Sequence, residues 1–246
     1  MSADKPSLLY RIIKRCVYLV YRPYEIVGAE NLPEEPALIV GNHSQTHGPL
    51  AMELYAPRRR YTWCVHEMLS FREVSAYAYR DFWSGKPKGI RWLYRIVSYL
   101  IAPLAWVIFN NACVIPVYYD NRLLSTFRET AKRLSEGADV VIFPEGYTPR
   151  SSVIYEYREG FASIAAFYRQ KAKKNVGFVP MYICPALRKI LYGAPTQIDF
   201  SKPVKEETER VRQYLMKETE RLARSLPPHR VVPYPNLPKK EYPMSK

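Results

Sequence analysis

Two short polar segments follow apolar runs of the chain, and each carries side chains that could do chemistry. His43 comes just after Ala37–Val40, and Glu145 and Gly146 come just after Val140–Ile142. The ends of buried strands are where α/β proteins collect functional residues. A histidine there can take up and return a proton near neutral pH, so His43 is a candidate general base.

The residues around this candidate base suggest two kinds of site. Glu145 could accept hydrogen bonds from hydroxyl groups, and Gly146 would allow a tight loop whose amides meet a phosphate. His47 follows His43 by four residues, so on a helical turn the two imidazoles would share a face. They could also bind a metal. A metal site is less favoured than a general base here, because its third ligand would have to be His66 or a glutamate.

Charge and cysteine usage limit the possible functions. The 246 residues include 37 Lys and Arg against 23 Asp and Glu, a net charge of +14. This excess favours a polyanionic partner: nucleic acid, an anionic membrane face, or a phosphorylated or CoA-bearing substrate. No zinc pattern or RNA-binding aromatic motif is present, so we expect no nucleic acid. The four cysteines are scattered, which predicts a reducing, cytosolic setting. The absence of Gly-x-Ser-x-Gly argues against a serine hydrolase.

Short β-rich stretches alternate with helical patterns along the chain. This alternation predicts a single α/β domain with a mixed, mostly parallel sheet flanked by helices. The expected strands are 24–28, 37–41, 61–65, 114–119, 140–143, 178–183 and 197–200, and the expected helices are 8–21, 49–56, 67–80, 90–109, 123–136, 158–173 and 206–225.

We expect three segments. Residues 1–23 form a basic amphipathic, membrane-associating helix, 24–225 the main domain, and 226–246 a Pro-rich basic tail that is extended over the surface or mobile. The apolar run 96–109 is interrupted by Pro103 and falls short of a clear membrane span of about 20 residues. It and the first helix could lie in a membrane interface or pack on the core.

In this order the motifs resemble the glycerolipid acyltransferase family, whose best-known members acylate lysophosphatidic acid. The resemblance covers about residues 24–204. It implies a glycerol-phosphate-acyltransferase-like fold and the transfer of a fatty acyl group from acyl-CoA or acyl carrier protein to a lysophospholipid or glycerol phosphate. It implies no cofactor, since the thioester is a co-substrate. The matching motifs are Gly28-x-Glu30-Asn31-Leu32-Pro33, Asn42-His43, Phe143-Pro144-Glu145-Gly146, Gly160–Ala165 and Val179-Pro180.

The resemblance also implies roles for individual residues. His43 would deprotonate the acceptor hydroxyl, which attacks the thioester directly. Pro144, Glu145 and Gly146 would help to bind the glycerol-phosphate end, and Pro180 would line the site.

The first motif departs from the family at one position. The family has a histidine, four residues and an aspartate, and here the aspartate position is Gly48. That carboxylate orients the imidazole, and a misoriented base loses orders of magnitude in rate. His47 could accept a hydrogen bond from His43 without supplying charge. Glu53 and Glu67 are further candidates that the sequence alone does not place.

The phosphate-binding arginines are also displaced. The family places a glycine and an arginine around Ile-Pro-Val, and here the segment is Cys113–Tyr119, with Tyr119 at the arginine position. Arg122 is near enough to substitute. Arg150 could serve as the arginine expected after Glu145 and Gly146 if the loop is longer. We therefore predict that Arg150 or Arg122 binds phosphate.

These departures leave open a protein that has kept the fold and lost catalysis. Such a protein would bind or scaffold lipid without turnover, and Gly48→Asp would then restore activity. Either way we expect a peripheral or interfacial protein on the cytoplasmic face of a membrane, with acyl-CoA or acyl carrier protein and anionic phospholipid as partners. The cations that could meet headgroups are Arg58, Arg59, Arg60, Lys86, Lys88, Arg91 and Arg95.

Overall fold

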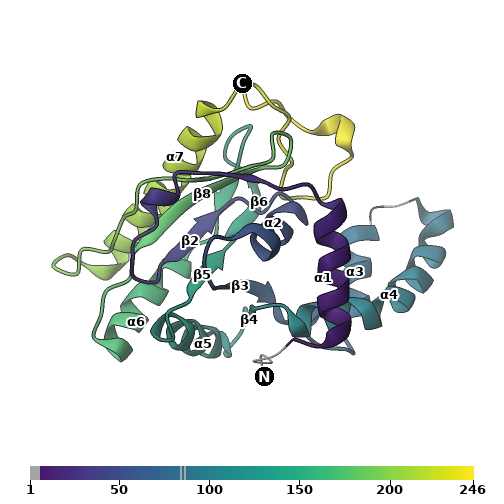
Figure 1. Ribbon diagram of the computed structural model, residues 1–246, viewed down its shortest axis with the longest axis horizontal. Coiled ribbons are helices and arrows are strands. Elements are labelled where there is room, and N and C mark those ends of the chain that lie inside the picture. The colour runs from purple at the N-terminus through teal and green to yellow at the C-terminus, as the bar shows by residue number, and fades with distance from the viewer. Residues whose placement is uncertain (1–5, 84, 86) are drawn as a thin grey trace. The chain divides into compact units, whose positions relative to one another are not determined.

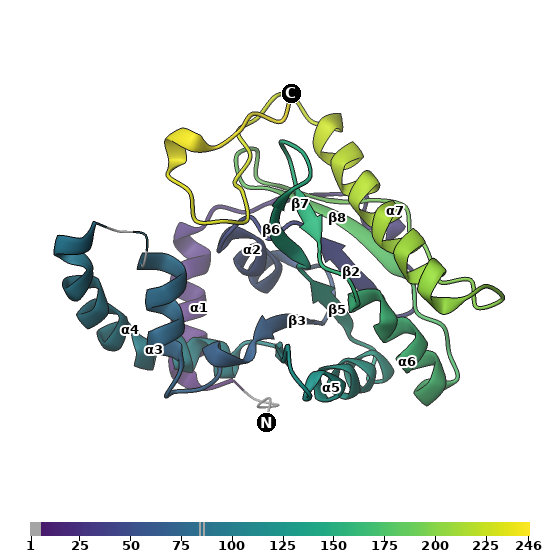
Figure 2. The same cartoon turned by 180° about the vertical axis from the view of Figure 1, so that it is seen from behind.

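Three largely apolar, buried runs form the central strands of a sheet in the computed structural model (Figures 1 and 2). They are β2 (Leu38–Gly41), β5 (Asp139–Ile142) and β8 (Phe178–Cys184). β2 lies between the other two and pairs in parallel with both. Parallel strands that are covered on both faces have continuous apolar runs, which is the pattern seen here.

The structure describes residues 6–83, 85 and 87–246, and it comprises two compact units. Unit 1 lies within residues 1–21 and 63–126. Unit 2 lies within residues 22–62 and 127–246.

The sheet of unit 2 continues on both sides of the central strands, in the order β1-β9-β8-β2-β5-β3. β1 with β9 and β3 with β5 are parallel pairs, whereas β8 and β9 are antiparallel. β3 runs on into unit 1, where β4 is next in the strand order. A separate antiparallel pair is formed by β6 and β7. The bounds of these strands are β1 Glu25–Val27, β3 Arg60–Val65, β4 Val114–Val117, β6 Glu145–Pro149, β7 Tyr155–Tyr157 and β9 Lys189–Tyr192.

Helices cover this sheet. α7 (Val204–Ser225) packs along β8, and Figure 2 shows α6 (Ile164–Ala172) near it. The buried residues of α7 include Val211, Leu215 and Leu222, which recur at helical spacing and form one apolar stripe. α2 (His47–Tyr55) also contacts β8. α5 (Leu123–Ser135) begins in unit 1 and continues into unit 2.

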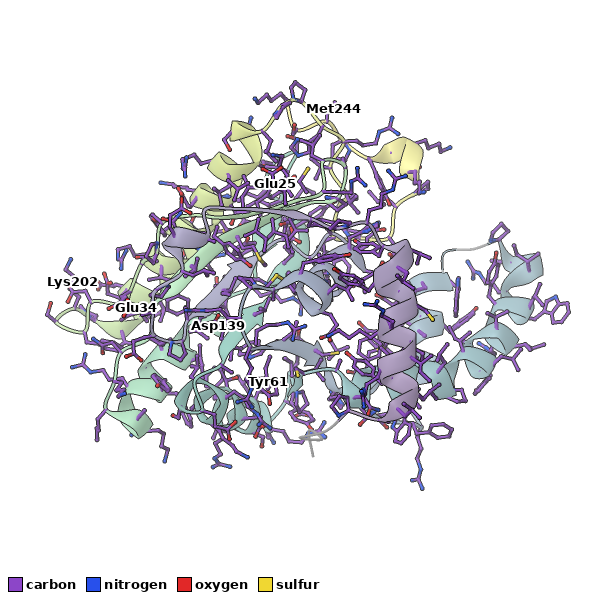
Figure 3. The ribbon with its side chains drawn as sticks, in the orientation of Figure 1. Glu25, Glu34, Tyr61, Asp139, Lys202 and Met244 are labelled. Atoms are coloured by element: carbon purple, nitrogen blue, oxygen red, sulfur yellow. The ribbon has the colours of Figure 1, made fainter. Side chains whose placement is uncertain are left out.

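Asp139, labelled in Figure 3, is a buried charge at the start of β5. Its Oδ1 accepts the Ala37 backbone N–H (2.9 Å) and an Arg58 guanidinium N–H (2.6 Å), and its Oδ2 accepts the Arg58 Nε–H (2.9 Å). The carboxylate thus joins the segments that lead into β2, β3 and β5. Buried charges persist where they are paired and hydrogen-bonded in this way.

Unit 1 contains α1 (Leu8–Val20), α3 (Val74–Ala78) and α4 (Arg91–Asn111). The Ser7 backbone N–H donates to Asn111 Oδ1 (2.7 Å), which ties the start of α1 to the end of α4. A small apolar cluster holds the unit together. It contains Met68, Val74 and Ala102, with Cys64, Val65, Tyr77, Ala105 and Phe109 packed against them.

The predicted α/β class with a mixed, mostly parallel sheet flanked by helices is confirmed. Several predicted elements are wrong. The stretch 67–80 is not one helix, because a turn at 69–73 separates a 3-10 turn (His66–Met68) from α3, and a π turn (Tyr79–Trp83) follows α3. The strand expected at 197–200 is absent, and only Thr196 forms an isolated bridge, to Phe178. β6, β7 and β9 were not predicted.

The tail has little regular structure, as its prolines predict, but it is held in place by hydrogen bonds. Arg230 and Met244 form an isolated antiparallel bridge. The Val231 N–H donates to the Pro243 carbonyl (2.9 Å), and the Ser245 N–H donates to the His229 carbonyl (3.0 Å). The segment therefore closes into a loop rather than trailing over the surface.

Candidate active site

Asn42 fixes the point at which the chain leaves β2. This buried side chain accepts the Ile183 N–H at its Oδ1 (2.7 Å) and donates from its Nδ2 to the Ile183 carbonyl (3.0 Å). The carboxyl ends of β2 and β8 are thereby joined. His43 emerges from this joint, at the edge of the sheet where α/β proteins bind ligands.

Glu145 fixes the backbone of His43. Its Oε2 accepts the His43 backbone N–H (2.6 Å), and its Oε1 accepts the Tyr155 backbone N–H (3.0 Å). The carboxyl group is buried, and burial raises its pKa to about 7 although these two hydrogen bonds lower it in part. Both oxygens that were expected to meet a substrate hydroxyl are therefore engaged with the main chain.

The turn after His43 has an unusual backbone. Ser44 and Gln45 have positive φ angles of 48° and 54°. This left-handed region costs a residue other than glycine about 1 kcal/mol or more, and such residues gather at functional sites. Two hydrogen bonds close the turn, from the His47 N–H to the Ser44 carbonyl and from the Gly48 N–H to the His43 carbonyl, both at 3.1 Å.

Gly48 packs directly against the His43 main chain. A β carbon at this position would lie 2.3 Å from the His43 carbonyl oxygen and 3.0 Å from its carbon. Real contacts of this kind are essentially never so short, and the obstructing atoms belong to the backbone. An aspartate could enter the turn here only if the His43 backbone moved, so Gly48→Asp would change the turn that carries the candidate base.

The His43 ring lies among aromatic side chains. It meets Phe143 and Tyr234 edge to face, with centroid distances of 5.2 and 5.5 Å. Its Nδ1 is buried and has no hydrogen-bond partner among the described residues. Burial lowers the pKa of His43 to about 4, and the nearby Gln45 backbone raises it only in part. The imidazole is therefore neutral at pH 7, as a general base must be.

The other groups proposed to support His43 have different partners. His47 begins α2 while His43 precedes it, so the two do not share a helical face as expected. Burial, and then the charge of Lys239, lowers the pKa of His47. Glu53 pairs with Arg60.

In unit 1, Glu67 lies 3.1 Å from the His66 ring and 3.7 Å from the Arg80 guanidinium. None of these interactions brings a carboxylate to Nδ1 of His43. In the part of the chain that the structure describes, no three His, Cys, Asp or Glu side chains gather as a metal site would require.

The candidate phosphate-binding arginines both have acidic neighbours. In unit 2, Arg150 lies 3.1 Å from Glu156 and 3.4 Å from Glu220. In unit 1, Arg122 pairs with Asp120 at 2.7 Å. A phosphate would have to compete with these carboxylates for either arginine.

The remaining predicted site residues lie in or beside strands. Pro144 is buried before β6, and Pro180 is buried in β8 opposite Val40 of β2. Gly146 belongs to β6 rather than to a tight loop, and an added β carbon would lie 3.3 Å from the Glu156 carbonyl. A side chain here would therefore be a tight fit between the paired strands.

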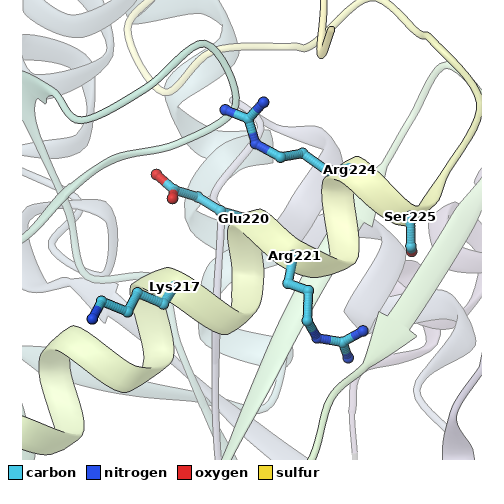
Figure 4. A pocket seen from close by; sticks show the side chains of 5 residues that line it. All are labelled: Lys217, Glu220, Arg221, Arg224 and Ser225. Carbon is cyan, nitrogen blue, oxygen red and sulfur yellow. The ribbon is translucent and has the colours of Figure 1, made fainter.

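A hollow of about 520 Å³ lies elsewhere in unit 2, along α7, and Figure 4 shows its side chains. None of the predicted site residues lines it. Its lining residues are Lys217, Glu220, Arg221, Arg224 and Ser225.

The contributions of Gln45 and Tyr234 to this site were not predicted from the sequence. Gln45 donates from Nε2 to the Pro235 carbonyl (3.0 Å) and accepts from the Tyr242 hydroxyl (3.1 Å). Tyr234 lies 191 positions after His43, in a Pro-rich segment without periodicity. No local pattern could have paired them.

Comparison with known proteins agrees with the motif order. The sequence model described as Acyltransferase matches residues 24–186, which is more than half of the chain. The chain belongs to the Acyltransferase family. The family predicted from the motifs is thus confirmed at this level. No curated protein matches the chain at a significant level.

A solved structure is similar to this acyltransferase-family chain. It is the 1-acyl-sn-glycerophosphate (LPA) acyltransferase PlsC from Thermotoga maritima. The two are 14% identical, with a TM-score of 0.48, and the match covers 89% of this chain and 78% of the PlsC chain.

Substitution of Gly48 tests the tight packing of this acyltransferase-family turn. We expect Gly48→Ala to lower the free energy of unfolding by about 1–3 kcal/mol, because the added methyl forces the His43 backbone to move. Urea denaturation measures the loss. Gly177→Ala is the matched control, since its β carbon would approach no atom closer than 3.8 Å. Equal stability of the two variants would contradict the packing described here.

The opposite pKa shifts of His43 and Glu145 predict a compensated pH dependence. Between pH 4.5 and 6.5 the unfolded chain binds a proton at His43 and the folded chain binds one at Glu145. The first effect makes stability rise with pH and the second makes it fall, so the two cancel. In His43→Gln we expect only the effect of Glu145 to remain. Its stability relative to wild type should then fall by about 1.4 kcal/mol per pH unit.

Urea titrations across this pH window measure that difference, and groups common to both proteins cancel in it. A difference that does not vary with pH would mean that the pKa of His43 is not lowered in the folded protein.

Proposed function

We propose that the protein transfers a fatty acyl group from an acyl-CoA or acyl carrier protein thioester to a hydroxyl of a lysophospholipid or glycerol phosphate. The activity would resemble that of a 1-acylglycerol-3-phosphate O-acyltransferase, a step of phospholipid biosynthesis. One observation carries the proposal: an Acyltransferase-family chain presents a neutral imidazole, His43, at the carboxyl end of its central strand.

In the proposed reaction His43 acts through Nε2, because Nδ1 is buried. Nε2 takes the proton of the acceptor hydroxyl while the hydroxyl oxygen bonds to the thioester carbonyl carbon. The tetrahedral intermediate collapses, the C–S bond breaks, and the thiolate leaves with the proton that His43 returns. The products are an ester and a free thiol. The proposed reaction uses no resident cofactor or metal and no acyl-enzyme.

The other predicted residues have supporting roles. Glu145 holds the His43 backbone, and Pro144 and Gly146 flank it in the chain, while Pro180 lies within β8 opposite Val40. Arg150 or Arg122 would bind the acceptor phosphate in exchange for a carboxylate partner. His47, at the start of α2, would add a second imidazole to the site.

A thiol-release assay tests the reaction. Purified protein should release free thiol from acyl-CoA or acyl carrier protein when lysophosphatidic acid or glycerol 3-phosphate is present. We expect His43→Ala to lower kcat by about 10²–10⁴-fold, the usual contribution of a general base. Val204→Ala, at the exposed start of α7, is the control and should keep the wild-type kcat. An unchanged rate in His43→Ala would show that His43 is not the base.

Among the described residues no carboxylate reaches Nδ1 of His43, and this favours a second candidate, a lipid-binding or scaffolding protein without catalysis. This candidate expects lipid binding and no thiol release with any donor or acceptor. The same assay decides between the two, since turnover by the unmodified protein excludes it.

Unit 1 supports a membrane as partner. Lys88–Asn111 is a helix long and apolar enough to cross a bilayer, and only 11% of its most apolar window is buried. The exposed fraction of Trp92 is 65% and that of Leu100 is 74%. Pro103 lies inside this helix, where a proline removes a backbone hydrogen bond. An exposed apolar face of this size is typical of an interaction surface.

α1 is amphipathic and adds to this apolar surface. Its exposed side chains include Leu8, Leu19 and Val20. Large apolar side chains beside arginines and lysines are typical of helices that lie in a bilayer interface. We therefore infer a peripheral or interfacial position on the cytoplasmic face of a membrane, with unit 1 in contact with anionic lipid.

The three adjacent arginines expected to meet headgroups have other partners. Arg58 pairs with Asp139 and the buried Arg60 with Glu53, while Arg59 lies over the Tyr61 ring. Lys86 lies outside the described residues. Lys88, Arg91 and Arg95 remain candidates for headgroup contacts.

Vesicle flotation tests the membrane proposal. We expect the double variant Trp92→Gln/Leu100→Gln to bind phosphatidylglycerol-containing vesicles at least about tenfold more weakly, because two large apolar side chains are lost. Val204→Gln on α7 of unit 2, 41% exposed, is the control and should bind like wild type. Equal binding of all three proteins would contradict the assignment of α4 as the contact surface.

A further inference from the structure

The C-terminal strap, residues 227–246, is fastened at its base to the core of unit 2. His229 is buried in it, and its Nε2 lies 2.9 Å from the hydroxyl of Tyr182 in β8. The Ser245 hydroxyl accepts the His229 N–H (3.1 Å), and the Arg230–Met244 bridge closes the loop. The strap is therefore a fixed part of unit 2, although its six prolines exclude regular structure over most of its length.

The middle of the strap is docked on the turn that follows His43. The Gln45 side-chain amide uses both of its ends: Nε2 donates to the Pro235 carbonyl, and Oε1 accepts from Tyr242. Gln45 is one of the two residues of this turn with positive φ. The strained turn is thus tied to the strap at two points on either side of residues 236–241.

This docking brings the Tyr234 ring against the candidate base. Tyr234 meets His43 at a centroid distance of 5.5 Å and Tyr147 at 5.2 Å. Phe143 meets His43 at 5.2 Å. The imidazole therefore has one ring from the strap and one from the segment between β5 and β6 against it.

These contacts matter because no carboxylate among the described residues holds the imidazole, and beside the rings only the Gln45 backbone acts on it. Nδ1 has no partner among the described residues, and Gly48 leaves no room for the carboxylate that the motif would otherwise supply. Glu145 holds the backbone of His43 and not its ring. The direction of Nε2 then depends on ring packing, for which edge-to-face contacts have a preferred geometry.

We propose that Tyr234 is a positioning residue for His43, holding the imidazole by ring packing in place of the motif aspartate. The inference rests on the proposed function. It assigns the C-terminal strap to the active site and makes Gln45 the tie that seats it.

Three variants of the full chain test this role. Tyr234→Ala removes the ring, Tyr234→Phe keeps it without the hydroxyl, and Leu237→Ala removes an exposed apolar side chain from the same strap. We expect Tyr234→Ala to lower kcat by about 10–100-fold, as misplaced catalytic groups do, with a smaller change in KM. Tyr234→Phe and Leu237→Ala should keep at least half of the wild-type kcat.

A second readout does not depend on activity. NMR titration of the His43 ring should give a pKa well below 6.5 in wild type and in Tyr234→Phe, and a pKa shifted upward in Tyr234→Ala, where the ring becomes solvated. Glu145 and Tyr234 are the titratable groups in contact with His43, and Leu237→Ala leaves both in place.

The outcomes separate the possibilities. A higher kcat in Tyr234→Ala would overturn the proposal and make the strap an obstructing lid. Unchanged kcat and unchanged His43 pKa in Tyr234→Ala would also overturn it. If the unmodified protein has no activity, the proposed function fails, and the titration still decides whether Tyr234 packs on His43.

Gln45→Ala supplies a test if Tyr234→Ala does not fold. It keeps every aromatic ring and removes both ties to the strap. We expect the same direction of change in kcat and in the His43 pKa. Wild-type values of both in Gln45→Ala would contradict the role given to the docked strap.

Discussion

The candidate site depends on one carboxyl group that makes no direct contact with any reacting atom in the proposed chemistry. Glu145 accepts the backbone N–H of His43 with one oxygen and that of Tyr155 with the other. It thereby joins the end of β2 to the β6–β7 pair, two parts of the chain that are about a hundred residues apart. Because the group is buried, losing either bond would leave an unpaired polar atom in the interior, which costs about 1–3 kcal/mol. The carboxyl group therefore constrains the backbone of the candidate base far more strongly than a surface group could.

In this arrangement different groups hold the main chain and the ring of the histidine. A carboxylate commonly holds the imidazole ring itself and stabilises its charged form. Here the buried carboxyl holds the main chain, and aromatic rings surround the imidazole. Burial disfavours the charged imidazolium, and this lowers the pKa of His43 to about 4. The ring is a weak base that is always unprotonated at neutral pH.

The sequence predicted the central strands well because their apolar runs are continuous and end in recognisable residues. His43 and Glu145 were placed at strand ends for that reason. It did not predict β6, because Glu145–Pro149 contains glycine and proline and has no alternation. Nor could it predict Tyr234 beside His43, since nothing in a Pro-rich segment indicates which distant turn it meets. Gly48 was identified as a departure, but its cause, the close approach to the His43 carbonyl, exists only in three dimensions.

The position of Gly48 also bears on how such a chain could change over generations. An aspartate cannot enter the turn while the His43 carbonyl lies 2.3 Å from the position of its β carbon. The backbone would have to take another path first, and residues 44 and 45, with their left-handed conformation, belong to the path that it has now. A single change to aspartate at position 48 therefore requires the His43 backbone to move as well. Replacement of this glycine by aspartate therefore requires changes at the neighbouring turn residues as well.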